Sequence, residues 1–224
     1  MLKFKDIKIN NSISRSAISV IIVLIITKFF GLIKQTIIAA FFGIGFEMDS
    51  YLLVSDFIEE VGVVLFSSLS ISFLNHYNFF SNISQKEKNQ FAIEILTTFV
   101  PLSCVVIVIV LSCSEPISFL LAPGFSENER DYVKRILILL SITIINKCLS
   151  SYFTTILEAE KDFIPGKLSG ILQSCCIISG ILLFADRLDV YSLIYSYIIY
   201  NILQNIYLFI KSLKYINYHL DFRI

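Results

Sequence analysis

Long apolar runs dominate the chain from residue 16 to residue 210. Six of them reach the roughly 20 residues that an α-helix needs to cross a bilayer core, and they occupy residues 16–41, 50–74, 91–113, 132–157, 164–185 and 190–210. The runs are too long, and too uniformly apolar, for the alternating strands of a membrane barrel. The pattern therefore predicts an all-α integral membrane protein. A six-helix transmembrane lobe at residues 16–212 follows a short N-terminal segment, 1–15, and precedes a C-terminal tail, 213–224.

Composition agrees with this fold class and excludes several functions. The chain is 56% hydrophobic, and its mean hydropathy is +0.77. Its 18 basic and 18 acidic residues give no net charge, so nothing indicates nucleic-acid binding. Five cysteines lie within or beside the apolar runs without metal-ligand spacing, and we interpret them as packing residues rather than disulfides. We expect no metal and no cofactor. Because no clear cleavage site follows the basic N-terminus, an uncleaved first helix is preferred to a signal peptide.

Basic residues in the short connections predict the orientation. If the N-terminus is cytoplasmic, eleven basic residues fall on that side: Lys3, Lys5, Lys8, Arg15, Lys86, Lys88, Lys161, Lys167, Lys211, Lys214 and Arg223. Four fall on the other side: Arg130, Lys134, Arg135 and Arg187. We therefore expect both termini in the cytoplasm and the protein in the inner (cytoplasmic) membrane.

Five ionisable side chains interrupt the first two spans: Lys28 and Lys34 in the first, and Asp56, Glu59 and Glu60 in the second. Each charge facing lipid at mid-bilayer would cost roughly 2.5–3.5 kcal/mol, so these groups are expected to face protein or a wet cavity. If the two spans form an antiparallel hairpin turning near Gly45, Lys34 lies level with Asp56, and Lys28 with Glu60.

Two interpretations of these charges remain open. The pairs either join two helices structurally, or they line a polar cavity whose lysines bind an anionic substrate and whose carboxylates gate it or bind a coupling ion. Lys28 and Lys34 lie about 120° apart around their helix, so a hinge at Gly31 is expected to bring both inward. Asp49, near the start of the second helix, either caps that helix or takes part in gating. The polar group around Asn146, in the fourth span, is expected to join helices rather than bind a ligand.

Ser126 and Glu129 have the spacing of a capping box that opens the fourth helix. The preceding Pro123 and Gly124 break the chain, so the segment that joins the third and fourth spans is expected to be an exposed loop.

Several motifs resemble the MurJ/MviN family of lipid II flippases. TKFFGLIK (27–34), AAFFGIG (39–45) and DSY (49–51) are similar to the opening of that family. APGF (122–125) stands where the family has the same four residues, and residues 157–165 resemble its segment between the fourth and fifth helices. The resemblance implies a basic central cavity that receives the pyrophosphate and sugar head of an undecaprenyl-linked substrate and alternates between inward- and outward-open states.

By this resemblance, Lys28 and Lys34 match two cavity arginines of the family, and Asp49 matches its aspartate. Lysine keeps the positive charge but lacks the bidentate fork that suits phosphate oxygens. Gly62 and Val63 replace a basic pair of the second helix, so we expect a less positive cavity. Such transporters also need two lobes that move about a shared site, whereas six spans supply one. A separate second lobe or a homodimer is therefore expected.

The leading functional hypothesis is a MurJ-like flippase lobe that moves lipid II across the membrane for peptidoglycan synthesis. An O-antigen or capsule repeat-unit flippase is the alternative within the same class. A truncated, inactive or regulatory membrane subunit is the alternative in a second class. An enzyme is not expected, because both histidines lie near span ends and no nucleophile–base group accompanies them.

Overall fold

The computed structural model describes residues 2–217, with side chains from residue 18 onward, and this part of the chain is helical. The basic residues of the predicted N-terminal segment, and residues 218–224 of the predicted tail, lie outside the described side chains. The helices are α1 (Leu2–Phe42), α2 (Phe46–Ile83), α3 (Gln85–Ser112), α4 (Ser114–Leu121), α5 (Glu127–Ser141), α6 (Thr143–Ala159), α7 (Ile164–Leu188) and α8 (Tyr191–Ser212).

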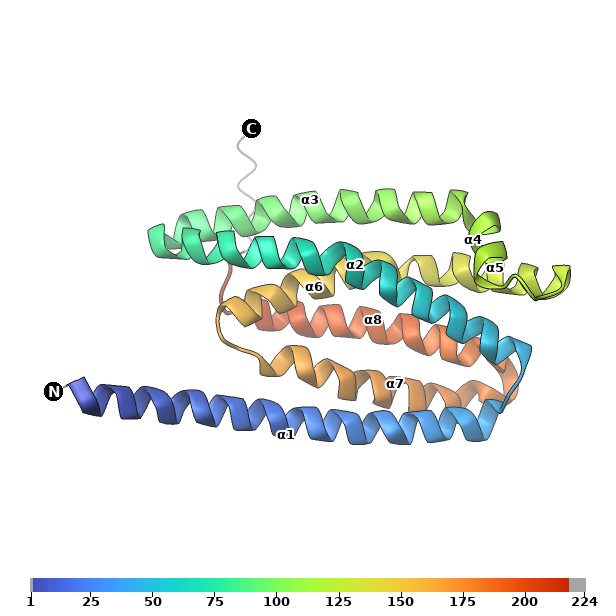
Figure 1. Ribbon diagram of the computed structural model, residues 1–224, viewed down its shortest axis with the longest axis horizontal. Helices are drawn as coiled ribbons and strands as arrows, with labels where there is room; N and C mark the ends of the chain where they lie inside the picture. The colour runs from blue at the N-terminus through green and yellow to red at the C-terminus, as the bar shows by residue number, and fades with distance from the viewer. Residues whose placement is uncertain (1, 218–224) are drawn as a thin grey trace.

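The six predicted membrane spans are confirmed. Within the described residues, six helical segments are long and apolar enough to cross a membrane, and they fall on the predicted runs. Consecutive spans run in opposite directions, as Figure 1 shows. The first helix, α1, begins at Leu2, so helical structure also includes residues of the predicted N-terminal segment.

The fourth span consists of two helices, α5 and α6, rather than the single predicted helix. They meet at Ile142, where hydroxyls on both sides bond to the backbone. Ser141 Oγ donates to the carbonyl of Ile138 at 2.7 Å, and Thr143 Oγ1 donates to the carbonyl of Leu140 at 2.6 Å. Such local bonds compete with the helical ladder, and hydropathy alone does not reveal them.

The expected loop around Pro123 and Gly124 is confirmed, and a short helix, α4, which the sequence did not indicate, precedes it. The predicted capping box is confirmed where the loop ends. The backbone N–H of Ser126 donates to Glu129 Oε2 at 2.8 Å, and α5 begins at the next residue.

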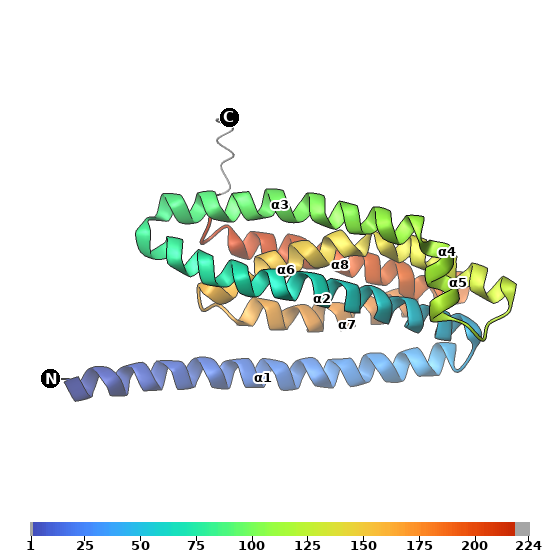
Figure 2. The same ribbon diagram turned by 45° about the horizontal axis from the view of Figure 1, so that its top comes forward.

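The helices form two groups, which Figures 1 and 2 show from two directions. α2, α3, α5 and α6 pack together, while α1 packs along α7 and α7 packs along α8. α6 also packs against α8 and so joins the groups. α1 and α2 share no extended contact in the described residues, although a short turn connects them. The expectation that they form a tight hairpin was therefore wrong.

Aromatic rings fill the space among α2, α3 and α6. Phe73 stacks on Tyr152 with ring centroids 5.4 Å apart, and Phe99 packs edge-on to Tyr152 at 6.4 Å. The Tyr152 hydroxyl donates to the carbonyl of Ala92 at 2.7 Å, which satisfies it inside this apolar core. The outer faces of α1 and α3 expose isoleucine, valine, leucine and phenylalanine, as a surface that faces lipid requires.

Small residues on α7 allow its neighbours to approach closely. A Cβ on Gly170 would lie 2.5 Å from Thr27 Cγ2 of α1, and a Cβ on Gly180 would lie 2.8 Å from Ser196 Cβ of α8. Close approach at small residues is typical of helix pairs in membranes. α7 is therefore the helix that holds α1 against the rest of the bundle.

Candidate functional site

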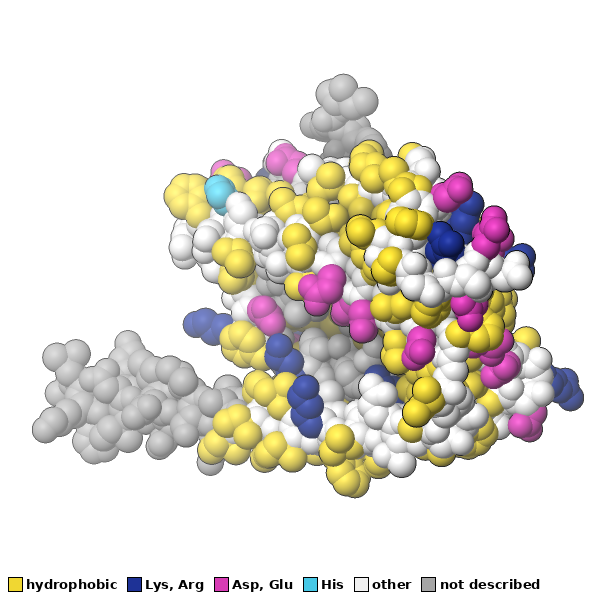
Figure 3. Space-filling view, turned by 45° about the vertical axis from the view of Figure 1, so that its right-hand side comes forward, with side chains coloured by type: hydrophobic (Ala, Val, Ile, Leu, Met, Phe, Trp, Pro, Cys, Tyr) yellow, Lys and Arg dark blue, Asp and Glu magenta, His cyan; other side chains and the backbone are white. Residues whose placement is uncertain are grey.

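A hollow opens on one face of the molecule between α1 and α2. Figure 3 shows acidic side chains along one margin of it and basic side chains along the opposite margin. The basic margin belongs to α1, which carries Lys28 and Lys34, and the acidic margin to α2, where Asp56 and Glu59 lie. The hollow exists because α1 packs on α7 and leaves α2 unpaired on this side.

The larger of two cavities in this region has a volume of about 470 Å³. Five helices line it: α1, α2, α6, α7 and α8. Its charged side chains are Lys28, Lys147, Lys167 and Glu59, so three cations face one anion. Serines and glutamines complete the polar lining. The arrangement suits an anionic ligand that also offers hydrogen-bond donors.

Contacts between α1 and α7 position Lys28 in this cavity. Its neighbour Thr27 lies against Gly170, and the Thr27 hydroxyl donates to the carbonyl of Lys167 at 3.3 Å. Thr27 Oγ1 also bonds to the carbonyl of Val23 at 2.8 Å within α1. These bonds keep Lys28 beside Lys167, whose ammonium lies 3.9 Å from Glu158 Oε1.

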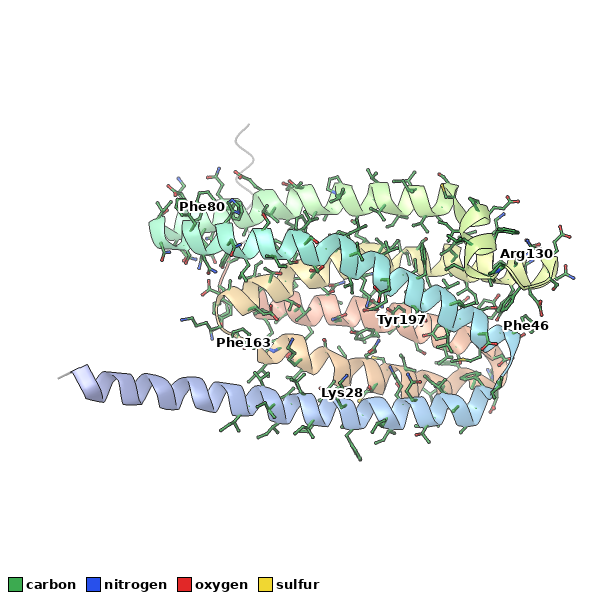
Figure 4. The ribbon with its side chains drawn as sticks, in the orientation of Figure 1. Lys28, Phe46, Phe80, Arg130, Phe163 and Tyr197 are labelled. Carbon is green, nitrogen blue, oxygen red and sulfur yellow. The ribbon has the colours of Figure 1, made fainter. Side chains whose placement is uncertain are left out.

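Glu59 of α2 is held by two other helices. Lys147 of α6 forms an ion pair with its carboxylate, and the Tyr197 hydroxyl of α8 donates to Glu59 Oε2 at 2.8 Å. The Lys147 ammonium also lies 5.5 Å from the centre of the Tyr197 ring, within the range of a cation–π contact. Figure 4 shows Tyr197 on α8 and Lys28 on α1, both near the middle of the bundle's length.

The smaller cavity has a volume of about 140 Å³ and lies beside the larger one. Lys34, Asp56 and Glu59 are its ionisable groups of α1 and α2, and Tyr51 and Tyr197 contribute aromatic faces. Glu59 and Gln173 line both cavities, so these two residues stand at the boundary between them.

Lys34 and Asp56, which were predicted to lie level, line the same smaller cavity, whereas Glu60 lies outside the larger cavity that Lys28 lines. Among the described residues, no ion pair joins α1 to α2, and Glu59 takes its partner from α6 instead. The prediction assumed a tight hairpin, which the packing of α1 on α7 prevents. Lys28 and Lys34 line different cavities, and α1 continues through Gly31 as one unbroken helix.

Two predicted site residues lie outside both of these cavities. Glu60 is exposed on α2, and Asp49 is exposed in the first turns of that helix. The N-cap residue of α2 is Gly45, with no side-chain cap, so the capping interpretation of Asp49 was wrong. Its carboxylate still lies near the positive end of the helix dipole.

The polar group around Asn146 joins helices, as expected, and also borders the larger cavity. Asn205 Nδ2 donates to Asn146 Oδ1 at 2.9 Å, which links α8 to α6. Ser70 Oγ lies 2.7 Å from Ser151 Oγ, which links α2 to α6. Lys147 of the same group also lines the larger cavity.

Sequence reasoning also missed Lys167 and Tyr197 as residues of this region. Lys167 had been counted with the cytoplasmic connection because it follows Pro165 closely, yet it lines the larger cavity. Lys147 carried a usable signal, since it lies near the middle of a predicted span and such a charge is costly without a partner. Tyr197 carried none, because one tyrosine in an aromatic-rich helix is not distinctive.

A bundle of membrane-length helices with charged cavities among them defines a multi-pass helical membrane protein. The profile of the family described as "Lipid II flippase MurJ" matches residues 38–220. The chain belongs to this family.

Curated relatives and a solved structure agree with this family membership. The chain is 29% identical over 204 residues to the "Probable lipid II flippase MurJ" of Rickettsia prowazekii (strain Madrid E), covering 88% of this chain and 39% of that protein. It is 30% identical over 179 residues to the protein of the same description from Synechocystis sp. (strain ATCC 27184 / PCC 6803 / Kazusa), covering 78% and 33%. The chain thus spans less than half the length of these relatives.

The fold is also similar to a solved structure titled "Lipid II flippase MurJ, inward closed conformation". The TM-score is 0.74 at 23% identity, and the match covers 91% of this chain and 43% of that one. The predicted resemblance to one lobe of the family is confirmed at the level of the fold.

Proposed function

We propose that the described helices form the first lobe of a flippase that translocates an undecaprenyl-pyrophosphate-linked cell-wall precursor, lipid II, across the cytoplasmic membrane. The observation that carries the proposal is the larger cavity, where lysines from α1, α6 and α7 surround one space between the helices. Charges on membrane-spanning helices are costly, and a ligand with several negative charges offsets that cost. Family membership favours the same function, and it favours transport over catalysis.

The geometry suggests how a head group would be held. Lys28 and Lys167 would bind diphosphate oxygens from one wall, with Lys147 opposite. Serine hydroxyls and Gln173 would bind the sugar. The polyprenyl tail would leave through the opening between α1 and α2, toward lipid. Lys34, Asp56 and Glu59 of the smaller cavity would receive the head group or a coupling ion next.

Transport also requires parts outside these helices. A second lobe, from further chain, another subunit or a second copy, would complete the site about which the two lobes move. We place both termini in the cytoplasm, because the basic residues of the connections gather at the end of the bundle where α2 meets α3 and α6 meets α7. A hinge at Gly31 and a gating role for Asp49 and Glu60 at the rims of the hollow complete this proposal.

A capsule or O-antigen repeat unit is a second candidate substrate. Gly62 and Val63 line the larger cavity, so this part of α2 provides no positive charge to bind a head group. A substrate with few charged groups apart from its diphosphate would fit a cavity whose α2 side is uncharged better than a cavity that is basic on every side.

Native mass spectrometry of the purified protein with lipid II tests the proposal. We expect a one-to-one adduct with the wild type. The variant with both Lys28→Gln and Lys34→Gln should lose about tenfold or more in affinity, because each charge-assisted bond to phosphate contributes roughly 1.5–3 kcal/mol.

Lys86→Gln is the matched control, since Lys86 is an exposed lysine that lines neither cavity. Equal binding by all three proteins would contradict a substrate site at α1. Stronger binding of a capsule repeat unit than of lipid II would favour the second candidate.

A further inference from the structure

The Glu59–Lys147 ion pair stands at the boundary of the two cavities. Glu59 lines both, whereas Lys147 lines the larger one and Lys34 lines the smaller one. Glu59 therefore has a lysine on either side of it, and it is paired with only one of them. A position between two lysines is not required of an ion pair that only joins α2 to α6.

The two partners differ in how freely they can move. The Lys147 side chain is 14% exposed, and the Glu59 side chain is 48% exposed. Lys147 runs across Gly62, where an added Cβ would lie 3.2 Å from its Cβ and 3.3 Å from its Cγ. The lysine is thus seated between α6 and α2, while the carboxylate has open space beside it.

The charges around the Glu59–Lys147 ion pair determine when its two partners separate. Separating an ion pair whose lysine is buried is unfavourable unless another ion replaces the lost partner. In the larger cavity an anion would meet Lys28 and Lys167 as well as Lys147, and a diphosphate carries enough negative charge to serve all three. On the other side, Lys34 offers the released carboxylate a new cation.

We propose that substrate binding exchanges the partners of this pair: a diphosphate oxygen takes the place of Glu59 at Lys147, and Glu59 turns toward Lys34. The inference rests on the proposed function and makes Lys147 a substrate-binding residue. Glu59 is then a positioning residue that holds Lys147 ready in the empty cavity. Its movement removes the barrier between the two cavities and lets the head group pass toward Lys34.

A charge-conserving double variant tests the exchange. Glu59→Gln with Lys147→Met removes the pair without changing the net charge of the cavity, and glutamine keeps an acceptor for Tyr197. Binding of inorganic pyrophosphate and of farnesyl diphosphate to the purified protein is measured by calorimetry. We expect both to bind about tenfold more weakly, because one charge-assisted contact is lost. Tighter binding of farnesyl diphosphate than of pyrophosphate would identify a lipid-linked diphosphate as the natural source.

The matched control is Glu160→Gln with Lys88→Met, which removes another largely buried ion pair distant from both cavities. It should bind both probes as the wild type does. Unchanged binding by the Glu59/Lys147 variant would show a purely structural pair and overturn the exchange.

The single variants separate this inference from the proposed function. Glu59→Gln alone leaves Lys147 without its anion, so pyrophosphate should bind about tenfold more tightly than to the wild type. Weakened binding in Lys28→Gln, with no gain in Glu59→Gln, would support the anion site and overturn the exchange. No binding of either probe by the wild type or by Glu59→Gln would overturn both.

Discussion

Glu160→Ala is expected to destabilise the protein by about 3–5 kcal/mol, because it leaves a buried ammonium without its partner. Lys88 Nζ lies 2.8 Å from Glu160 Oε1, and only 7% of the Lys88 side chain is exposed. The Tyr77 hydroxyl donates to the same oxygen at 2.9 Å. One carboxylate thus links α2 and α3 to the end of α6, beyond which α7 begins.

The measurement is the midpoint of thermal unfolding in detergent, which is monitored as the loss of the monodisperse peak in size-exclusion chromatography. Glu160→Ala should lower it by about 10 °C, from the usual scaling for a chain of this size. Adding Lys88→Met to Glu160→Gln should recover most of the loss, since no buried charge remains. An unchanged midpoint in Glu160→Ala would show that the pair does not hold this end of the bundle.

Gly180→Leu is expected to separate α7 from α8 and to destabilise the lobe by about 3 kcal/mol or more. A Cβ at this position would lie 2.8 Å from Ser196 Cβ, so even alanine requires the helices to move apart. Both helices also line the larger cavity, through Gln173 and Gln204. The variant should therefore weaken diphosphate binding along with stability.

Cys175→Leu is the matched control for this prediction, because Cys175 is exposed on the same helix. The same unfolding measurement should show a clear fall for Gly180→Leu and little change for Cys175→Leu. Equal midpoints in the two variants would contradict the close packing of α7 on α8.

Local physics made the spans predictable from sequence. A segment in lipid must satisfy its own backbone, so an apolar run of sufficient length has to be helical. The capping box at Ser126 and Glu129 is likewise a contact between near neighbours, and the structure contains it. The break at Ile142 was missed because hydroxyl bonds to the backbone leave hydropathy unchanged.

The packing between helices that are distant in the chain could not be predicted from the sequence. Chain order suggested that the first two helices pair, whereas the contact of Thr27 with Gly170 places α1 on α7. Among the described residues, Lys28 and Lys34 therefore form no ion pair with α2, and Glu59 pairs with Lys147. The predicted depths of residues along α1 and α2 give no information about α6, the third helix, which supplies the partner of Glu59.

The proposed function requires that the larger cavity receives the head group of a lipid-linked precursor. Site-specific photo-crosslinking measures this contact, with a photoreactive residue at Val63, which lines this cavity, or at Val105, an exposed position of α3 outside it. With lipid II labelled in its sugar, we expect a strong adduct at position 63, reduced by unlabelled lipid II, and none above background at position 105. Equal labelling at the two positions, or an adduct at 105 alone, would show that the head group does not bind in this cavity.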